Sequence, residues 1–119
     1  VILDAYVPAS KAAAYLEYVQ AAVPTSTPVW LCPVRRPRRE QPLSPSGMPG
    51  EEELLINVAV WGRVSDSRGV EYVAAMEAKL LELGGRKMLY SPTSMTREDL
   101  YRRHVDGGAY EKLRQQYDP

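Results

Sequence analysis

The stretch at residues 53–63, ELLINVAVWGR, constrains the fold more than any other part of this 119-residue chain. Its alternation predicts a β-strand with Ile56, Val58 and Val60 on one side. The opposite side carries the row Leu55, Asn57, Ala59 and Trp61. A strand face that meets water normally carries charged residues or threonine. We therefore expect both faces of this strand to be covered, the second by something other than solvent.

Proline, glycine and hydrophobic spacing divide the rest of the chain into short elements. Strands are expected at residues 1–8, 29–34 and 86–91, and helices at 10–23, at 70–83 and from Thr96 onward with an interruption at 106–108. Ser10 is the expected N-cap of the first helix, and Thr96 with Asp99 forms a capping box for the third. The first helix is expected to bury the stripe Ala12, Leu16, Val19 and Val23.

The order of these elements is strand, helix, strand, strand, helix, strand, followed by a helical tail. This is the βαββαβ order of the ferredoxin-like sandwich, an α+β fold. Right-handed crossovers place the first and third strands in the centre of a four-stranded antiparallel sheet and the other two at its edges. Both helices then cover one face of the sheet, and its second face stays open.

Composition limits the function. A chain of 119 residues forms one domain, and its 15 basic and 15 acidic side chains give a formal net charge of zero. A general affinity for nucleic acid is therefore not expected. The chain has one cysteine, Cys32, so an internal disulfide is excluded and a reducing, intracellular environment is expected. One cysteine and one histidine, His104, are too few for a zinc site of the usual kind. No apolar run approaches the roughly 20 residues of a membrane-spanning helix.

Residues 35–50, RRPRREQPLSPSGMPG, contain four prolines and no hydrophobic period. Such a segment buries too little surface to offset its ordering entropy, so we expect a flexible loop. The arginines at its start could bind phosphate or an anionic lipid head group. The alternative is a solvated loop whose positive charges are neutralised by nearby acidic residues. It is favoured by the neighbouring Glu51, Glu52 and Glu53.

The open sheet face is the expected binding surface. It would present Ile2, Asp4, Tyr6, Leu55, Asn57, Ala59 and Trp61, joined by either Trp30 and Cys32 or their neighbours and by Met88 and Tyr90. Aromatic side chains with one amide and one carboxylate on an apolar floor are typical of a ligand site. The alternative is that this face packs against another domain or a second copy of the chain.

Several separated segments carry a family resemblance. They are YVP at 6–8, VWLCP at 29–33, ELLINVAVWG at 53–62 and GGRKMLYSPTSMTREDLYRRHVDGGAYEKLRQQY at 84–117. Together they resemble the C-terminal region of the Δ24-sterol reductases, which belong to the FAD-linked oxidases of the vanillyl-alcohol oxidase type. The resemblance spans nearly the whole chain except the Arg/Pro-rich loop.

The resemblance implies a two-part enzyme. An N-terminal FAD-binding domain of the same chain would hold the flavin, and residues 1–119 would be the C-terminal cap, inactive alone, whose sheet forms a wall of the substrate pocket. The implied reaction is reduction of an isolated alkene in a sterol-like or other apolar molecule, with NADPH restoring the flavin. The intact protein would then meet a membrane, in a eukaryote that of the endoplasmic reticulum.

The resemblance and the expected sheet together single out six residues. Tyr90 is the expected proton donor, with a packed tyrosine at the domain boundary as its alternative. The residues expected to face substrate or flavin are Tyr6, Trp30, Asn57, Trp61 and Met88. Related sterol reductases carry a carboxylate where this chain has Asn57, which puts an acid role there in doubt.

A second reading belongs to a different functional class. The chain would be a free-standing ferredoxin-like binding or regulatory module that associates through its open sheet face. In either case an exposed apolar wall favours self-association of the isolated chain.

Overall fold

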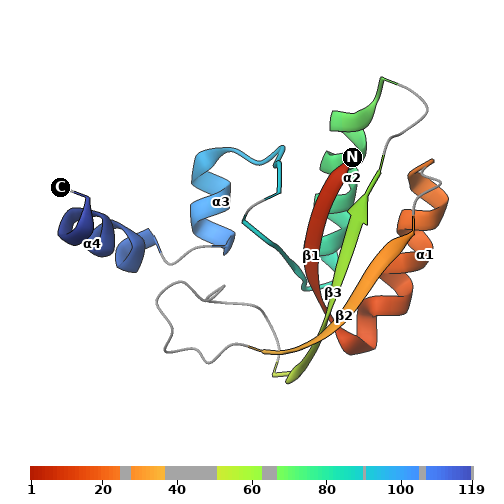
Figure 1. Ribbon diagram of the computed structural model, residues 1–119, viewed down its shortest axis with the longest axis horizontal. Helices are drawn as coiled ribbons and strands as arrows, with labels where there is room; N and C mark the ends of the chain where they lie inside the picture. Colours follow the sequence, from red (N-terminus) through yellow and green to blue (C-terminus); the bar gives the residue numbers. More distant parts are fainter. Residues whose placement is uncertain (25–27, 37–50, 63–66, 90, 105–106, 119) are drawn as a thin grey trace.

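The structure is a computed structural model that describes residues 1–24, 28–36, 51–62, 67–89, 91–104 and 107–118. Its strands are β1 (Ile2–Pro8), β2 (Val29–Arg35), β3 (Leu54–Trp61) and β4 (Arg86–Lys87), and its main helices are α1 (Ala12–Ala22), α2 (Gly69–Glu82), α3 (Arg97–His104) and α4 (Gly107–Tyr117). The sheet is antiparallel with the order β2-β3-β1-β4. Helices α1 and α2 lie side by side against one sheet face (Figure 1). This confirms the predicted α+β class, with the strand order that a ferredoxin-like fold requires.

The register of the central strands decides which residues meet the helices. Leu3 pairs with Val60, and Ala5 pairs with Val58, so these side chains share one face of the sheet. They are at most 1% exposed and pack in one cluster with Tyr15, Val19, Tyr72, Met76 and Leu80 from the two helices. Burial of each larger side chain stabilises the fold by about 1.5 to 3 kcal/mol. The predicted core side of β3 is confirmed.

For the first helix, the expected N-cap was wrong and the expected buried stripe was met at three of its four positions. A short 3₁₀ turn, η1 (Ala9–Lys11), precedes α1, and Ser10 does not cap the helix. Instead the backbone N–H and the hydroxyl of Ser10 donate hydrogen bonds to the carboxylate of Glu52, at 2.8 and 2.7 Å. Of the expected stripe, Ala12, Val19 and Val23 are buried, and Leu16 is only partly buried. Its neighbour Tyr15, which was not expected in the stripe, is fully buried. The sheet below the helix, not spacing alone, selects which of two adjacent positions points inward.

The fourth strand is shorter than the predicted residues 86–91. Among the described residues of this stretch, only Arg86 and Lys87 pair with β1, and one further backbone bond runs from Met88 N–H to the Asp4 carbonyl at 2.7 Å. The chain then turns, and the Ser91 hydroxyl donates a hydrogen bond to the Met88 carbonyl at 3.2 Å. After this turn, hydrogen bonds from Lys87 to the Ser91 and Pro92 carbonyls and from Ser94 to Glu77 hold the chain beside α2.

The edge strand β2 includes Arg35, which was expected in the loop. Arg35 pairs with Leu54 of β3, and its guanidinium lies 2.6 Å from the carboxylate of Glu53. The Arg36 side chain donates a hydrogen bond to the Glu52 carbonyl at 2.9 Å. The first two arginines of the basic run therefore bind neighbouring glutamate residues. Residues 37–50 lie outside the described residues.

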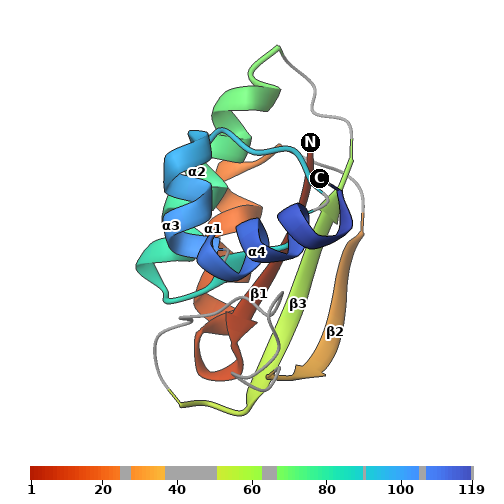
Figure 2. The same ribbon diagram turned by 90° about the vertical axis from the view of Figure 1, so that its left-hand side faces the viewer.

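Helices α3 and α4 extend from the sheet as an arm (Figure 1). The predicted cap of α3 is confirmed, since the Thr96 hydroxyl accepts a hydrogen bond from the Asp99 N–H at 3.1 Å. The two helices touch through an edge-to-face contact between Tyr101 and Tyr110, whose ring centroids lie 5.6 Å apart. Helix α4 buries no residue, and Figure 2 shows it in front of the strands when the molecule is turned.

Candidate functional site

The sheet face away from α1 and α2 carries the candidate site. The register places Asp4 opposite Ala59 and Tyr6 opposite Asn57 on this face. Strand β2 adds Trp30 opposite Ala59 and Cys32 opposite Asn57. The sequence had left open whether Trp30 and Cys32 or their neighbours would join this row, and the pairing of β2 with β3 selects Trp30 and Cys32.

Asp4 is the buried carboxylate of this face. It is 1% exposed, although it lies in the middle of a row that the helices do not cover. The indole N–H of Trp61 donates a hydrogen bond to its Oδ2 at 2.5 Å, and the amide of Asn57 donates to its Oδ1 at 3.4 Å. Hydrogen bonds to a carboxylate are stronger than neutral ones, so Asp4 fixes the orientation of the Trp61 ring.

Asn57 is held from three directions. Its amide nitrogen lies within hydrogen-bond distance of Asp4 Oδ1, of the Ala5 carbonyl at 3.3 Å and of the Met88 sulfur at 3.2 Å. The side chain is 8% exposed. The expectation that a mid-strand amide needs a partner is confirmed. Because the amide is anchored to protein atoms, it serves to position Asp4 and Met88.

These contacts surround a cavity of about 270 Å³. It is lined by Asp4, Trp30, Asn57, Ala59 and Trp61 and is called here the Asp4 pocket. The two tryptophans are 68% and 58% exposed, whereas the floor residues are almost completely buried. An exposed aromatic rim around a buried polar floor can hold a small group by aromatic contact and by one hydrogen bond.

Asp4 places a negative charge on this face, and Arg86 of β4, which pairs with Tyr6 on the same side of the sheet, places a positive charge at its other edge. Burial raises the pKa of the Tyr6 hydroxyl above its ordinary value, and the nearby charge of Asp4 raises it further. Among the residues that the structure describes, no cationic group forms an ion pair with Asp4. The only charge on the pocket floor is therefore a carboxylate with two neutral donors.

The structure brings most of the predicted site residues together. Trp30, Asn57 and Trp61 line the pocket, while Tyr6 and Met88 flank it through Asn57. Tyr90, the expected proton donor, lies outside the described residues.

Two side chains of the open row differ from what the sequence suggested. Leu55 was expected on the exposed wall but is 0% exposed, so it is not available to a ligand. Asp4 was expected on the open face but was not among the residues assigned to substrate or flavin, although a carboxylate in the centre of an apolar strand was a usable signal. Its opposite neighbour across the ladder is the small residue Ala59, which leaves room above the carboxylate.

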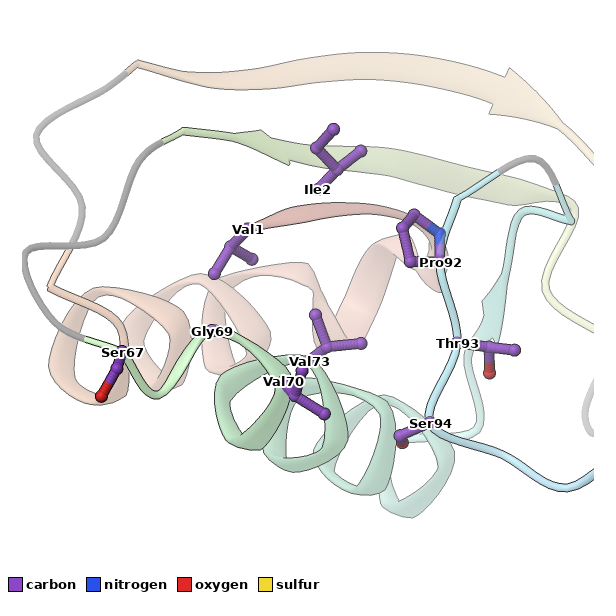
Figure 3. Close-up of a pocket in the computed structure, with 9 residues that line it drawn as sticks. All are labelled: Val1, Ile2, Ser67, Gly69, Val70, Val73, Pro92, Thr93 and Ser94. Carbon is purple, nitrogen blue, oxygen red and sulfur yellow. The ribbon is translucent and has the colours of Figure 1, made fainter.

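A second cavity of about 400 Å³ lies between the start of β1, the first turn of α2 and residues 92–94 (Figure 3). Its walls are the side chains of Val1, Ile2, Val70, Val73 and Pro92, with Ser67, Gly69, Thr93 and Ser94 at the rim. The lining side chains include hydroxyl groups but no acid, base or thiol. This cavity offers apolar contact without a group suited to catalysis.

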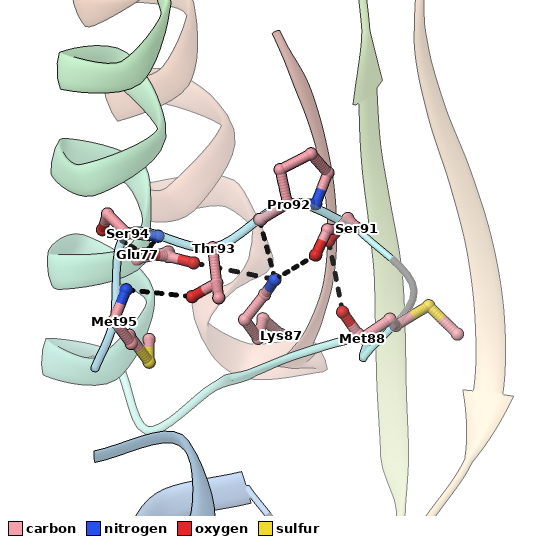
Figure 4. A network of polar contacts seen from close by, with 8 residues as sticks. All are labelled: Glu77, Lys87, Met88, Ser91, Pro92, Thr93, Ser94 and Met95. Atoms are coloured by element: carbon pink, nitrogen blue, oxygen red, sulfur yellow. Dashed lines mark hydrogen bonds and ion pairs between the residues drawn. The ribbon is translucent and has the colours of Figure 1, made fainter. Parts of the chain in front are cut away.

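Residues 91–95 are attached to the core by a buried polar network (Figure 4). Lys87 lies on the helix side of the sheet beside Glu77 of α2, and both bind backbone or side-chain groups of this segment. Burial lowers the pKa of the Lys87 ammonium, and the charge of Glu77 partly opposes that effect. The network lies away from the open face, so its role is to set the path of the chain after β4.

The chain matches no protein-family model, no curated protein sequence and no solved structure. Within the described ranges there is no group of three histidine, cysteine, aspartate or glutamate side chains that could hold a metal ion. None of the described helices is long and apolar enough to cross a membrane.

Proposed function

We propose that this chain is the substrate-binding cap of an FAD-dependent oxidoreductase that reduces an isolated alkene of a sterol-like substrate, with NADPH as electron donor. The observation that carries the proposal is the Asp4 pocket on the sheet face that α1 and α2 leave free. Trp30 and Trp61 expose more than half of their surface there. Large aromatic side chains left open beside a buried carboxylate favour a face that a ligand or another domain covers.

The chemistry of the proposal comes from the segment resemblance. When bound, reduced FAD supplies the hydride that the alkene reduction requires. The described residues offer no glycine-rich phosphate cradle, since Gly84 and Gly85 form the end of α2, where Gly84 has a φ of 76°. The cap residues fit a flavin only as an aromatic wall beside its ring, and its phosphates would be held by the proposed N-terminal domain.

The residues present indicate which part of the substrate pocket this chain would form and which part the flavin domain would form. Trp30 and Trp61 exclude water from one side of the substrate, and Asn57 orients Asp4 and Met88 on the floor. A cavity of about 270 Å³ is slightly smaller than the roughly 300 to 1,000 Å³ of complete small-molecule sites. This chain therefore supplies one wall, and the rest of a sterol-sized pocket belongs to the flavin domain. Tyr90 remains the predicted proton donor.

The test uses the intact protein encoded by the parent gene. The visible absorption spectrum reports bound flavin, and NADPH consumption with a sterol alkene reports turnover. We expect Trp30→Leu to lower turnover while leaving the flavin content unchanged, because the side chain is exposed and forms part of the wall. Tyr117→Leu on α4 is the matched control, because Tyr117 is 75% exposed and does not line the pocket.

Two outcomes would contradict the proposal. An intact protein that binds no flavin cannot be this kind of oxidoreductase. Equal turnover of the wild type and of Trp30→Leu would show that the open face is not a substrate wall. A separate variant, Tyr90→Phe, is expected to lower turnover without loss of FAD, and unchanged turnover would remove Tyr90 from the mechanism.

The second candidate function is a free-standing ferredoxin-like module that associates through the same face. It is favoured by the exposure of Ile2, Trp30 and Trp61, which are 50%, 68% and 58% exposed on one sheet surface. In this case the 119-residue chain forms a dimer in sedimentation experiments, and Trp30→Glu makes it a monomer. A flavin-binding sequence upstream in the same reading frame would favour the first function instead.

A further inference from the structure

The starting point is the unbalanced charge of Asp4. Its carboxylate is 1% exposed and receives hydrogen bonds only from the neutral groups of Trp61 and Asn57 among the described residues. Buried charged groups in proteins are normally paired with an opposite charge. The longer of its two bonds, 3.4 Å to Asn57, leaves Oδ1 with unused acceptor capacity. The Asp4 pocket therefore attracts a cation more strongly than a neutral group and repels an anion.

The aromatic rim of the pocket also favours a cation. The electron-rich face of an indole ring attracts cations, and tryptophan does so more strongly than tyrosine or phenylalanine. Both tryptophans of the chain, Trp30 and Trp61, line this one cavity. Trp30 of β2 pairs with Ala59, and Trp61 lies two residues further along β3, so both rings border Ala59, whose small side chain keeps the floor open. Aromatic rings around a carboxylate are the arrangement by which proteins bind alkylated ammonium groups.

We propose that the Asp4 pocket binds a small organic ammonium group, with Asp4 as the counter-charge and Trp30 and Trp61 as the aromatic walls. A volume of about 270 Å³ suits the head group of a ligand, whose remaining part lies over the open sheet face. A metal ion fits less well, because the pocket offers one carboxylate and no second acidic or imidazole ligand. This inference concerns the 119-residue chain itself and does not depend on a flavin domain.

The experiment compares two probes of the same shape. Choline carries a trimethylammonium group, and 3,3-dimethylbutan-1-ol replaces that nitrogen with carbon while keeping the hydroxyl. Because both tryptophans of the chain line the pocket, intrinsic fluorescence reports directly on its occupancy. We expect choline to change the tryptophan emission in a saturable manner. The neutral probe is expected to bind at least about tenfold more weakly, given the strength of a desolvated cation–π contact.

Variants separate the contributions of charge and ring. Asp4→Asn keeps the shape of the floor but removes its charge, so choline binding should be lost. Trp30→Leu keeps an apolar wall without an aromatic face, so it should lower the affinity for choline at least about threefold. Trp30 is 68% exposed, so this variant is expected to fold, as far-ultraviolet circular dichroism will check. If Asp4→Asn does not fold, the comparison of the two probes and the Trp30 variant still decide the question.

Each contrary result has a definite meaning. Equal binding of choline and its neutral analogue would overturn the ammonium assignment and identify Asp4 as an acceptor for a hydroxyl group. Absence of saturable binding by choline would remove the pocket as a cation site. Binding that survives in Asp4→Asn, or that Trp30→Leu leaves unchanged, would place choline elsewhere on the chain and contradict the proposal.

Discussion

The ammonium nitrogen of Lys87 lies 3.7 Å from a carboxylate oxygen of Glu77, and the two side chains are 1% and 2% exposed. Lys87 also donates hydrogen bonds to the carbonyls of Ser91 and Pro92, at 2.7 and 2.8 Å. The second oxygen of Glu77 accepts a hydrogen bond from the Ser94 N–H at 3.0 Å. One buried ion pair thus joins α2, β4 and residues 91–94, and it determines where the chain leaves the sheet (Figure 4).

We predict that Lys87→Met destabilises the protein by about 3 to 5 kcal/mol, because it leaves the carboxylate of Glu77 buried without a counter-charge. Urea denaturation gives the free energy of unfolding. The double variant Lys87→Met with Glu77→Leu should cost less than the single one, since it removes both charges together. Lys79→Met breaks the more exposed pair between Lys79 and Glu82 and should cost below about 1 kcal/mol. Equal costs for the two lysines would contradict the assigned role of Lys87.

We predict that Tyr15→Phe changes the alkaline stability of the protein. Burial raises the pKa of the Tyr15 hydroxyl well above its ordinary value, and the charge of Glu77 raises it further. Below about pH 10 both the folded and the unfolded state keep this proton, so it adds no pH dependence. Above about pH 10 the unfolded state loses the proton while the folded state keeps it, so the free energy of unfolding falls as the pH rises.

The measurement is the free energy of unfolding of wild type and Tyr15→Phe at a series of pH values from neutral to alkaline. The difference between the two should be constant below about pH 10 and should shift in favour of the variant above it. At neutral pH the substitution should cost less than about 1 kcal/mol, since the hydroxyl has no hydrogen-bond partner among the described residues. Parallel curves for both proteins up to strongly alkaline pH would show that Tyr15 is not buried.

We predict that the two tryptophans of the Asp4 pocket differ in their contribution to stability. Trp61→Phe removes the N–H that binds Asp4 at 2.5 Å, and it should cost about 1 to 3 kcal/mol. Trp30→Phe is the control, because Trp30 is 68% exposed and should change stability by less than about 0.5 kcal/mol. Thermal unfolding followed by circular dichroism measures both. A Trp61 variant as stable as the Trp30 variant would mean that the bond to Asp4 contributes nothing.

We predict that Gly85→Ala destabilises the protein by about 1 to 3 kcal/mol, because the added methyl group has no room. A Cβ at this position would lie 2.3 Å from Leu80 Cδ1 and 2.7 Å from the backbone oxygen of Tyr6. Gly108→Ala in α4 meets no close neighbour among the described residues and should leave stability unchanged or slightly raised. Chemical denaturation of both variants compares them directly. A harmless Gly85→Ala would mean that α2 and β1 can separate at this point.

The prediction of the fold succeeded where it depended on alternation. In β1 and β3 the aliphatic rows pointed to the helices as expected, since successive residues of a strand must face opposite sides. It failed at one position of α1, where Tyr15 rather than the adjacent Leu16 is fully buried, because both residues are compatible with an inward stripe. It also failed for β4, because a run of strand-forming residues does not reveal the partner that ends it.

The candidate site was predicted in the same uneven way. Asn57 and Trp61 were expected on one face from their positions in one strand, and they line one pocket. Trp30 was a candidate whose face the sequence left open, and the pairing of β2 with β3 places it in the same pocket. Asp4 was expected on the same face but not as the centre of the site. Its role follows from contacts with residues more than fifty positions away, which no local pattern contains.

The sequence by itself determined which side of each central strand faces the helices, because the two-residue period of an extended backbone is a property of covalent geometry. Only the tertiary structure decided that Trp61, 57 residues along the chain from Asp4, donates to its carboxylate, and that Lys87 ends β4 by binding Ser91 and Pro92. Hydrogen bonds and ion pairs depend on distances through space, and the register of the sheet fixes those distances.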